Sequence, residues 1–209
     1  MKRSIFLSSL LALSLVGCSG EKPAQIEEAP ADSPEAPQVT QDNTVEETSP
    51  TSLVIQRNKQ MGHIVFKGSK GPVTHQGGFS EFDLMMKLDV KDPEDITKSI
   101  IQLSVDVASL NTEVPELTEQ LLSPEFLDVN TYPQITFAST NIEMVDVYIY
   151  QITGKVTMHG VTQEESFTAV IDENMLHTQL LLNRLQYNIG PPDEIDEGIP
   201  MEVKIFFLK

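Results

Sequence analysis

FDLMMKLDV, at residues 82–90, decides the fold class, because apolar side chains occupy its even positions and mostly polar ones its odd positions. A period of two is typical of a β-strand with one buried and one solvated face. The same alternation recurs at residues 101–107, 148–159 and 201–207. Strands of this kind pair in antiparallel sheets, so the chain is expected to be all-β.

Weaker patterns extend this interpretation over the rest of the chain. Further strands are predicted at residues 53–58, 62–67, 134–144, 165–172 and 177–185, with turn residues between them. Many strands with little helix indicate a sandwich or a barrel.

One segment departs from the strand pattern and predicts a short inserted helix at residues 113–122. Leu117 and Leu121 fall on one helical face, Pro115 lies in the first turn, and Thr112 is a candidate N-cap. An apolar stripe on a short helix must be covered, so we expect this one to cover an open barrel end or a sheet face.

Residues 1–18 have the pattern of a secretory signal. Lys2 and Arg3 precede an apolar run that is too short to span a bilayer comfortably. The run ends at Gly17-Cys18, and small residues before a Cys resemble the lipobox of bacterial lipoproteins. This resemblance implies that Cys18 is acylated, and several acyl chains on one residue anchor a protein stably. The alternative is an ordinary signal peptide with a Cys nearby by chance.

Residues 19–52 are predicted to be a disordered linker. They contain five prolines, eight acidic residues and one lysine, and they lack aromatic residues. Such a segment buries too little apolar surface to offset the entropy of ordering it. It would separate the lipid anchor from one domain at residues 53–209. The net charge of −17 argues against a nucleic-acid partner, for which a basic surface is expected.

Four segments, in order along the chain, resemble the YceI-like family of polyisoprenoid-binding, lipocalin-like periplasmic proteins. They are SLNT at 109–112, LLSPEFLD at 121–128, YPQITF at 132–137 and GKVTMHGVT at 154–162. HQGGF at 75–79 and LNR at 182–184 resemble further family landmarks. The resemblance covers residues 53–209.

The resemblance implies an extended antiparallel β-barrel of about eight strands, a size that side chains can fill or that can hold one ligand. It also implies an elongated apolar interior that holds a long-chain amphiphile. Basic residues that relatives often carry near the loops are fewer here, as at Gln163. A quinone, an isoprenoid alcohol or a fatty amide therefore suits this chain better than a pyrophosphate.

Candidate ligand-binding residues follow from the alternation and from this resemblance. The apolar candidates are Phe82, Leu84, Met86, Ile135, Phe137, Met158 and Leu182. The methionines could line an adaptable pocket or fill gaps in a packed core. The residues alone leave open whether the interior is hollow.

Two polar residues are added to the candidate site. Arg184 shares a face with Leu182 by alternation, so it would either reach a polar headgroup or form an ion pair with a carboxylate. His159 precedes a Gly turn, and it either stabilises that turn or contacts the ligand. No resident cofactor, metal site or catalytic group is predicted, because the histidines show no ligand spacing and no nucleophile or phosphate-binding motif is present.

The leading functional hypothesis is a non-enzymatic carrier of a long-chain isoprenoid or similar apolar lipid. Cys18 would anchor it to a membrane of the cell envelope facing the periplasm, and Ser19 after the Cys favours the outer membrane. The alternatives are a structural or protein-interaction module with a filled barrel, and an enzyme that uses Arg184 with His159. The sequence does not identify a protein partner.

Substitution Cys18→Ala should release the full chain from membranes, because it removes the only site for acyl chains. Fractionation of cells into membrane and soluble pools measures this. Ser19→Ala is the control and should stay with the membranes. A Cys18→Ala variant that still sediments with membranes would contradict the lipoprotein hypothesis.

Overall fold

The computed structural model describes residues 52–193 and 195–208. Cys18 and the predicted signal and linker lie outside these residues, apart from Ser52, which begins the first strand. Within the described residues, no helix is both long enough and apolar enough to span a membrane.

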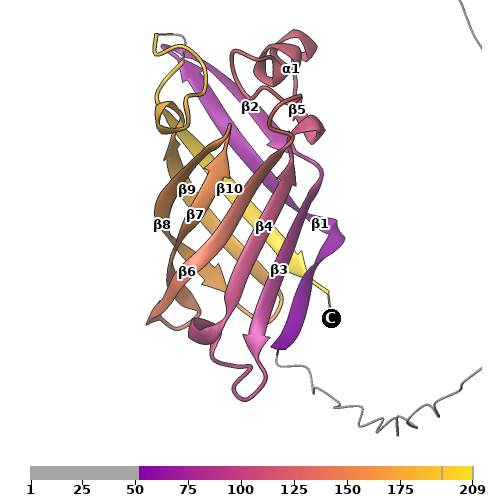
Figure 1. Cartoon of the computed structure of the whole chain (residues 1–209), viewed down its shortest axis with the longest axis vertical. Helices are drawn as coiled ribbons and strands as arrows, with labels where there is room; N and C mark the ends of the chain where they lie inside the picture. The colour runs from indigo at the N-terminus through magenta and orange to yellow at the C-terminus, as the bar shows by residue number, and fades with distance from the viewer. Residues whose placement is uncertain (1–51, 194, 209) are drawn as a thin grey trace, which may run out of the picture. The chain divides into compact units, whose positions relative to one another are not determined.

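Ten strands and one α-helix make up the domain (Figure 1). The strands are β1 (Ser52–Lys70), β2 (Val73–Phe79), β3 (Phe82–Asp89), β4 (Ile100–Asp106), β5 (Leu110–Thr112), β6 (Gln134–Asp146), β7 (Ile149–Met158), β8 (Val161–Ile171), β9 (Met175–Asn183) and β10 (Gly198–Phe207). The helix α1 (Pro115–Leu122) lies between β5 and β6, and three short 3-10 helices are η1 (Ile96–Lys98), η2 (Val107–Ser109) and η3 (Arg184–Tyr187).

Eight of these strands close into an antiparallel barrel. The order runs β10-β9-β8-β7-β6-β4-β3-β1, and β1 pairs again with β10 to complete the ring. β2 and β5 extend the sheet beyond β1 at the end of the barrel that carries α1 (Figure 1, top). The structure therefore confirms the predicted all-β barrel with a short inserted helix.

The first strand differs from its prediction as two separate strands at residues 53–58 and 62–67. β1 is continuous, but its register with β10 shifts between Arg57 and Gly62. Before the shift β1 pairs with β3, and after it with β2. Gly62 has φ 113° and an added Cβ would lie 2.7 Å from the Lys204 carbonyl oxygen, so a glycine is required there. Glycine residues in strand patterns often mark such irregularities, which explains why the pattern appeared interrupted.

Two strands were not predicted, because neither has enough alternation to reveal it. β2 contains two consecutive glycines, Gly77 and Gly78, and β5 has three residues. Strand ends also move by a few residues from their predicted positions. In particular, β9 ends at Asn183, so Arg184 lies in η3 rather than on the strand.

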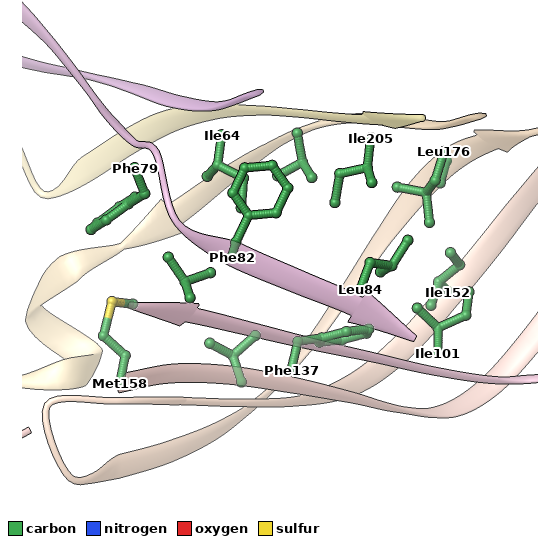
Figure 2. Packing of buried hydrophobic residues seen from close by; sticks show 14 of the residues in the cluster. Ile64, Phe79, Phe82, Leu84, Ile101, Phe137, Ile152, Met158, Leu176 and Ile205 are labelled. Atoms are coloured by element: carbon green, nitrogen blue, oxygen red, sulfur yellow. The ribbon is translucent and has the colours of Figure 1, made fainter. Parts of the chain in front are cut away.

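The alternating faces turn inward as predicted. Phe82, Leu84, Met86 and Leu88 on β3 are all buried, and the residues between them are more exposed. Figure 2 shows inward side chains from several strands converging, with Leu84, Phe137 and Ile205 contributed by β3, β6 and β10. Burial of this apolar surface is the main stabilising term, worth roughly 25 cal/mol per Å² removed from water.

Helix α1 covers one end of the barrel, one of the two places expected for it. It begins after Val114, which provides no side-chain cap, with Pro115 at the start of the helix. Thr112 is therefore not the N-cap. It lies on β5, and its buried hydroxyl hydrogen-bonds with the hydroxyl of Thr118 and donates to the carbonyl of Val114. These bonds hold the helix against the rim of the sheet.

Gly154→Ala should lower the free energy of unfolding by about 1–3 kcal/mol, the usual cost of overpacking a core. An added Cβ would lie 2.5 Å from both the Ala138 carbonyl oxygen and the Phe137 ring. Gly68→Ala is the control, because nothing lies within 4 Å of its added Cβ. Urea unfolding followed by circular dichroism measures both, and equal midpoints for the two variants would contradict this account of the packing.

Candidate functional site

Two apolar cavities follow one another inside the domain. The barrel cavity, of about 90 Å³, is lined mainly by inward residues of the ring, among them Ile64, Leu84, Ile101, Phe137, Ile152, Phe167, Leu176 and Leu180. The cap cavity, of about 150 Å³, lies beneath α1 and the loop after η3, and is lined among others by Phe66, Leu117, Leu121, Phe126, Met158, Arg184, Ile189 and Ile195.

Four side chains line both cavities and form a waist between them: Phe79, Ile135, Leu182 and Met201. They come from β2, β6, β9 and β10, so strands on different sides of the barrel meet at this point. A thin wall of movable side chains, rather than backbone, therefore separates the cavities. Met201 is the most adaptable of the four, since an unbranched thioether fills irregular space at little cost.

The roof of the cap cavity consists of α1, the segment that directly follows α1, and the loop after η3. Leu117 and Leu121 direct the apolar stripe of the helix into the cavity, as the pattern predicted. Phe126 packs beneath Gly190, where an added Cβ would lie 2.5 Å from its ring. The backbone N–H of Gly190 donates to the carbonyl of Glu125, which ties the two roof segments together.

Arg184 is buried, with 2 % of its surface exposed, and its guanidinium holds the loop that follows η3. Nε donates to the carbonyl of Asp196, and Nη1 donates to those of Ile189 and Gly190. Nη2 donates to the carbonyls of Pro191, Pro192 and Ile195 at 2.6 to 3.2 Å. Hydrogen bonds from a charged donor are about twice as strong as neutral ones, so the guanidinium is a strong clamp.

This geometry changes the interpretation of Arg184. The six bonds occupy every N–H group of the guanidinium, so its polar end supports the loop and is not directed at a ligand headgroup. Alternation could not reveal this, because it assumed that β9 continued through Arg184. The side chain still lines the cap cavity, where it acts as a wall.

His159 occupies the turn between β7 and β8. Its φ of 50° and the φ of 73° at Gly160 place two successive residues in the left-handed region, as a tight hairpin requires. Its Nδ1 lies 3.1 Å from the carbonyl oxygen of Tyr187, and its ring packs edge-on against Tyr132 with 4.8 Å between centroids. His159 is not among the residues that line either cavity, so the geometry favours the turn-stabilising alternative.

The apolar candidates divide into lining and packing residues. Leu84 and Phe137 line the barrel cavity, Met158 lines the cap cavity, and Ile135 and Leu182 line both. Phe82 and Met86 are buried but are not among the residues that line either cavity, so the structure places them in the packed core. Phe82 lies under the Arg57 guanidinium, whose central carbon is 3.9 Å from the ring centroid.

Several lining residues were missed by sequence reasoning. Met201 lies on a strand that the alternation did predict, but alternation identifies a face and not what that face surrounds. Ile189 and Ile195 lie on an irregular loop, where no periodic signal exists. Phe79 belongs to a landmark of the resemblance, which was the only sequence signal for it.

The charged groups whose pKa is shifted line neither apolar cavity. On the outer face, His177 Nε2 lies 3.1 Å from Glu202 Oε1 and His63 Nε2 lies 3.6 Å from it. The hydrogen bond with His177, followed by the effect of His63, holds the pKa of Glu202 below its usual range. Among residues 52–193 and 195–208, no group of three His, Cys, Asp or Glu side chains is placed to hold a metal ion.

A family model for the YceI-like domain matches residues 55–207. The chain therefore belongs to the YceI-like family, as the ordered motifs predicted.

A UPF0312 protein of Pseudomonas putida is 34% identical over 96 residues, which are 46% of this chain and 48% of that protein. The chain thus spans about half the length of such relatives.

Solved structures that share the fold include the following two. BcnA of Burkholderia cenocepacia has a TM-score of 0.67 at 20% identity, covering 73% of this chain and 99% of its own. A polyisoprenoid binding domain from Saccharophagus degradans, described as implicated in plant cell wall breakdown, has a TM-score of 0.56 at 14% identity, covering 74% and 97%.

Arg184→Lys should lower the free energy of unfolding by about 2–4 kcal/mol, because a lysine cannot satisfy the carbonyls that the planar guanidinium bonds. Exchange of the amide protons in residues 188–190 should quicken in the same variant. Lys155→Arg, at an exposed position on β7, is the control and should change stability by less than about 0.5 kcal/mol. Unchanged amide exchange in Arg184→Lys would contradict the clamp.

Proposed function

We propose that the domain binds a long-chain isoprenoid or a similar apolar lipid inside the barrel and acts as its carrier. The observation that carries the proposal is the pair of apolar cavities in series, separated by the waist of Phe79, Ile135, Leu182 and Met201. A domain of this size would normally pack its interior to close density, so two adjacent apolar voids call for a function.

The sizes of the cavities constrain the ligand. A cavity of 150 Å³ lined by apolar side chains holds about one benzene ring. A long chain therefore cannot bind unless the waist moves and joins the cavities. A slender chain requires a smaller movement than a fused ring system, which favours an unbranched or isoprenoid chain as the ligand.

The environment of the cavities favours an uncharged headgroup. The guanidinium of Arg184 is engaged by the loop carbonyls, and His75 and Gln76, at the exposed margin of the cap cavity, are the polar side chains nearest to solvent. A net charge of −17 on the chain adds repulsion toward an anionic ligand. A quinone, an isoprenoid alcohol or a fatty amide fits these constraints.

The fold shared with a polyisoprenoid binding domain supports the proposed ligand class. Binding rather than catalysis is proposed, because the cavity walls offer surface for an apolar chain and no arrangement of acid and base groups. The proposal includes anchoring through acylated Cys18 on the periplasmic side of the envelope, most simply at the outer membrane.

Native mass spectrometry of the full chain, followed by organic extraction, tests the proposed ligand class directly. We expect a bound mass that is removed by solvent and identified as a neutral long-chain lipid. An empty domain that also takes up no added prenyl alcohol would overturn the proposal in favour of a filled-barrel interaction module.

Ile135→Trp should weaken binding of a prenyl alcohol at least about tenfold, because the larger ring blocks the waist between both cavities. Gln134→Trp, on the exposed face of the same strand, is the matched control and should bind normally. Fluorescence titration measures both affinities, and far-ultraviolet circular dichroism verifies folding. Equal affinities for the two folded variants would exclude the waist from the binding site.

A further inference from the structure

The barrel wall is incomplete between β8 and β9. In the described chain, these strands pair at three positions: Ala169 with Thr178, Val170 with His177, and Ile171 with Leu176. Beyond this point the remaining residues of β8 pair only with β7, and those of β9 pair only with β10. The facing edges of the two strands therefore diverge above Ala169 instead of continuing their ladder.

Side chains define both limits of this gap, which we call the window. At the lower limit the buried hydroxyl of Thr178 donates to the carbonyl of Thr168 at 2.7 Å. This carbonyl lies next to the last paired position, Ala169 with Thr178. At the upper limit the Tyr187 hydroxyl donates to Glu165 Oε1 at 2.8 Å. Gln163 Nε2 donates to the carbonyl of Gln186 above it.

Tyr187 is a stable upper limit, because burial above all, and then the bond to Glu165, raise the pKa of its hydroxyl. The hydroxyl therefore remains protonated and continues to donate. Side-chain hydrogen bonds therefore join the two sides of the window at its lower and upper limits, while the backbones of β8 and β9 are not paired between these limits. These bonds limit how far the facing strand edges can separate.

The window lies between the barrel cavity and an outer groove. The groove, of about 310 Å³, runs along the outside of β8 and β9 and includes Gln179 and Leu181. Phe167 and Leu180 line both the groove and the barrel cavity. Both are partly buried, and Phe167 packs against Phe137 with 5.4 Å between ring centroids. These two side chains therefore lie between the barrel cavity and the outer groove.

We propose that the window is a lateral portal through which an apolar chain enters and leaves the barrel cavity, with Phe167 and Leu180 as its gate. The proposal rests on the proposed binding function and adds the route to it. Opening the window requires movement of side chains, whereas lifting the roof would break the hydrogen bonds by which Arg184 holds the loop after η3. Leu181, 67 % exposed at the rim, offers an approaching chain its first apolar contact.

A bulky maleimide attached to Leu181→Cys tests the portal from outside. The full chain carries Cys18→Ala, so that the introduced thiol is unique, and retinol, a fluorescent isoprenoid alcohol, is the probe. Stopped-flow fluorescence should show both uptake and release slowed by about tenfold with little change in Kd, as a blocked gate requires. The same label on Gln102→Cys, an exposed site on β4, should leave both rates unchanged.

Phe167→Ala tests the gate from inside. Removing the ring should speed the uptake of retinol by about fivefold. Because Phe167 also lines the barrel cavity, the uptake rate and not Kd is the readout. A merely destabilising substitution would instead weaken binding without faster uptake.

The outcomes separate the two proposals. Retinol that binds with rates unaffected by either change overturns the portal and leaves the cap end as the route. Equal slowing by the labels at Leu181→Cys and Gln102→Cys overturns it as well. A chain that binds neither retinol nor other prenyl alcohols overturns the proposed function itself, and the portal with it.

Discussion

The pairing of β1 with β10 is the constraint on which the rest of the structure depends. Without it the ring would be an open sheet, and its inward residues would face water. β1 closes the ring because the shift near Gly62 lets one strand change partners from β3 to β2, while its middle part, from Arg57 to Phe66, pairs with β10. A single irregularity thus both closes the barrel and directs β2 to the end where α1 builds the roof.

Once the barrel is closed, the same side chains must serve as core and as the lining of the cavities. Leu84, Phe137 and Leu182 are nearly inaccessible to water, yet they border open space. Unfilled volume costs contacts that a packed core would have made, so the fold gives up stability to retain it. Polar anchors such as Arg184 are placed at the margin of this region, where backbone carbonyls are available to meet their charge.

Alternation and ordered motifs predicted the ring, the inserted helix and the inward face of most strands. They succeeded because the direction in which a strand residue points depends on the local alternation of the sequence, which a single stretch such as residues 82–90 displays by itself. They failed where the role of a residue depends on which residues of other strands lie across the barrel from it. Phe82 and Leu84 share one face, yet only Leu84 borders a cavity. The role of Arg184 depends on where β9 ends and on the carbonyl groups of the following loop. No sequence pattern predicts the positions of those carbonyls.

The closing pair of strands also has a consequence for folding kinetics. Arg57 and Phe207 are neighbours in the barrel although they lie 150 positions apart along the chain. Contacts this distant in sequence are slow to form, because the loop entropy must be lost before the pairing can compensate. The hairpins from β6 through β10 can assemble locally, whereas the ring can close only after β1 docks on a finished β10. Until β1 docks, the facing edges of both strands lack their partners, and unpaired edges are where another chain can pair.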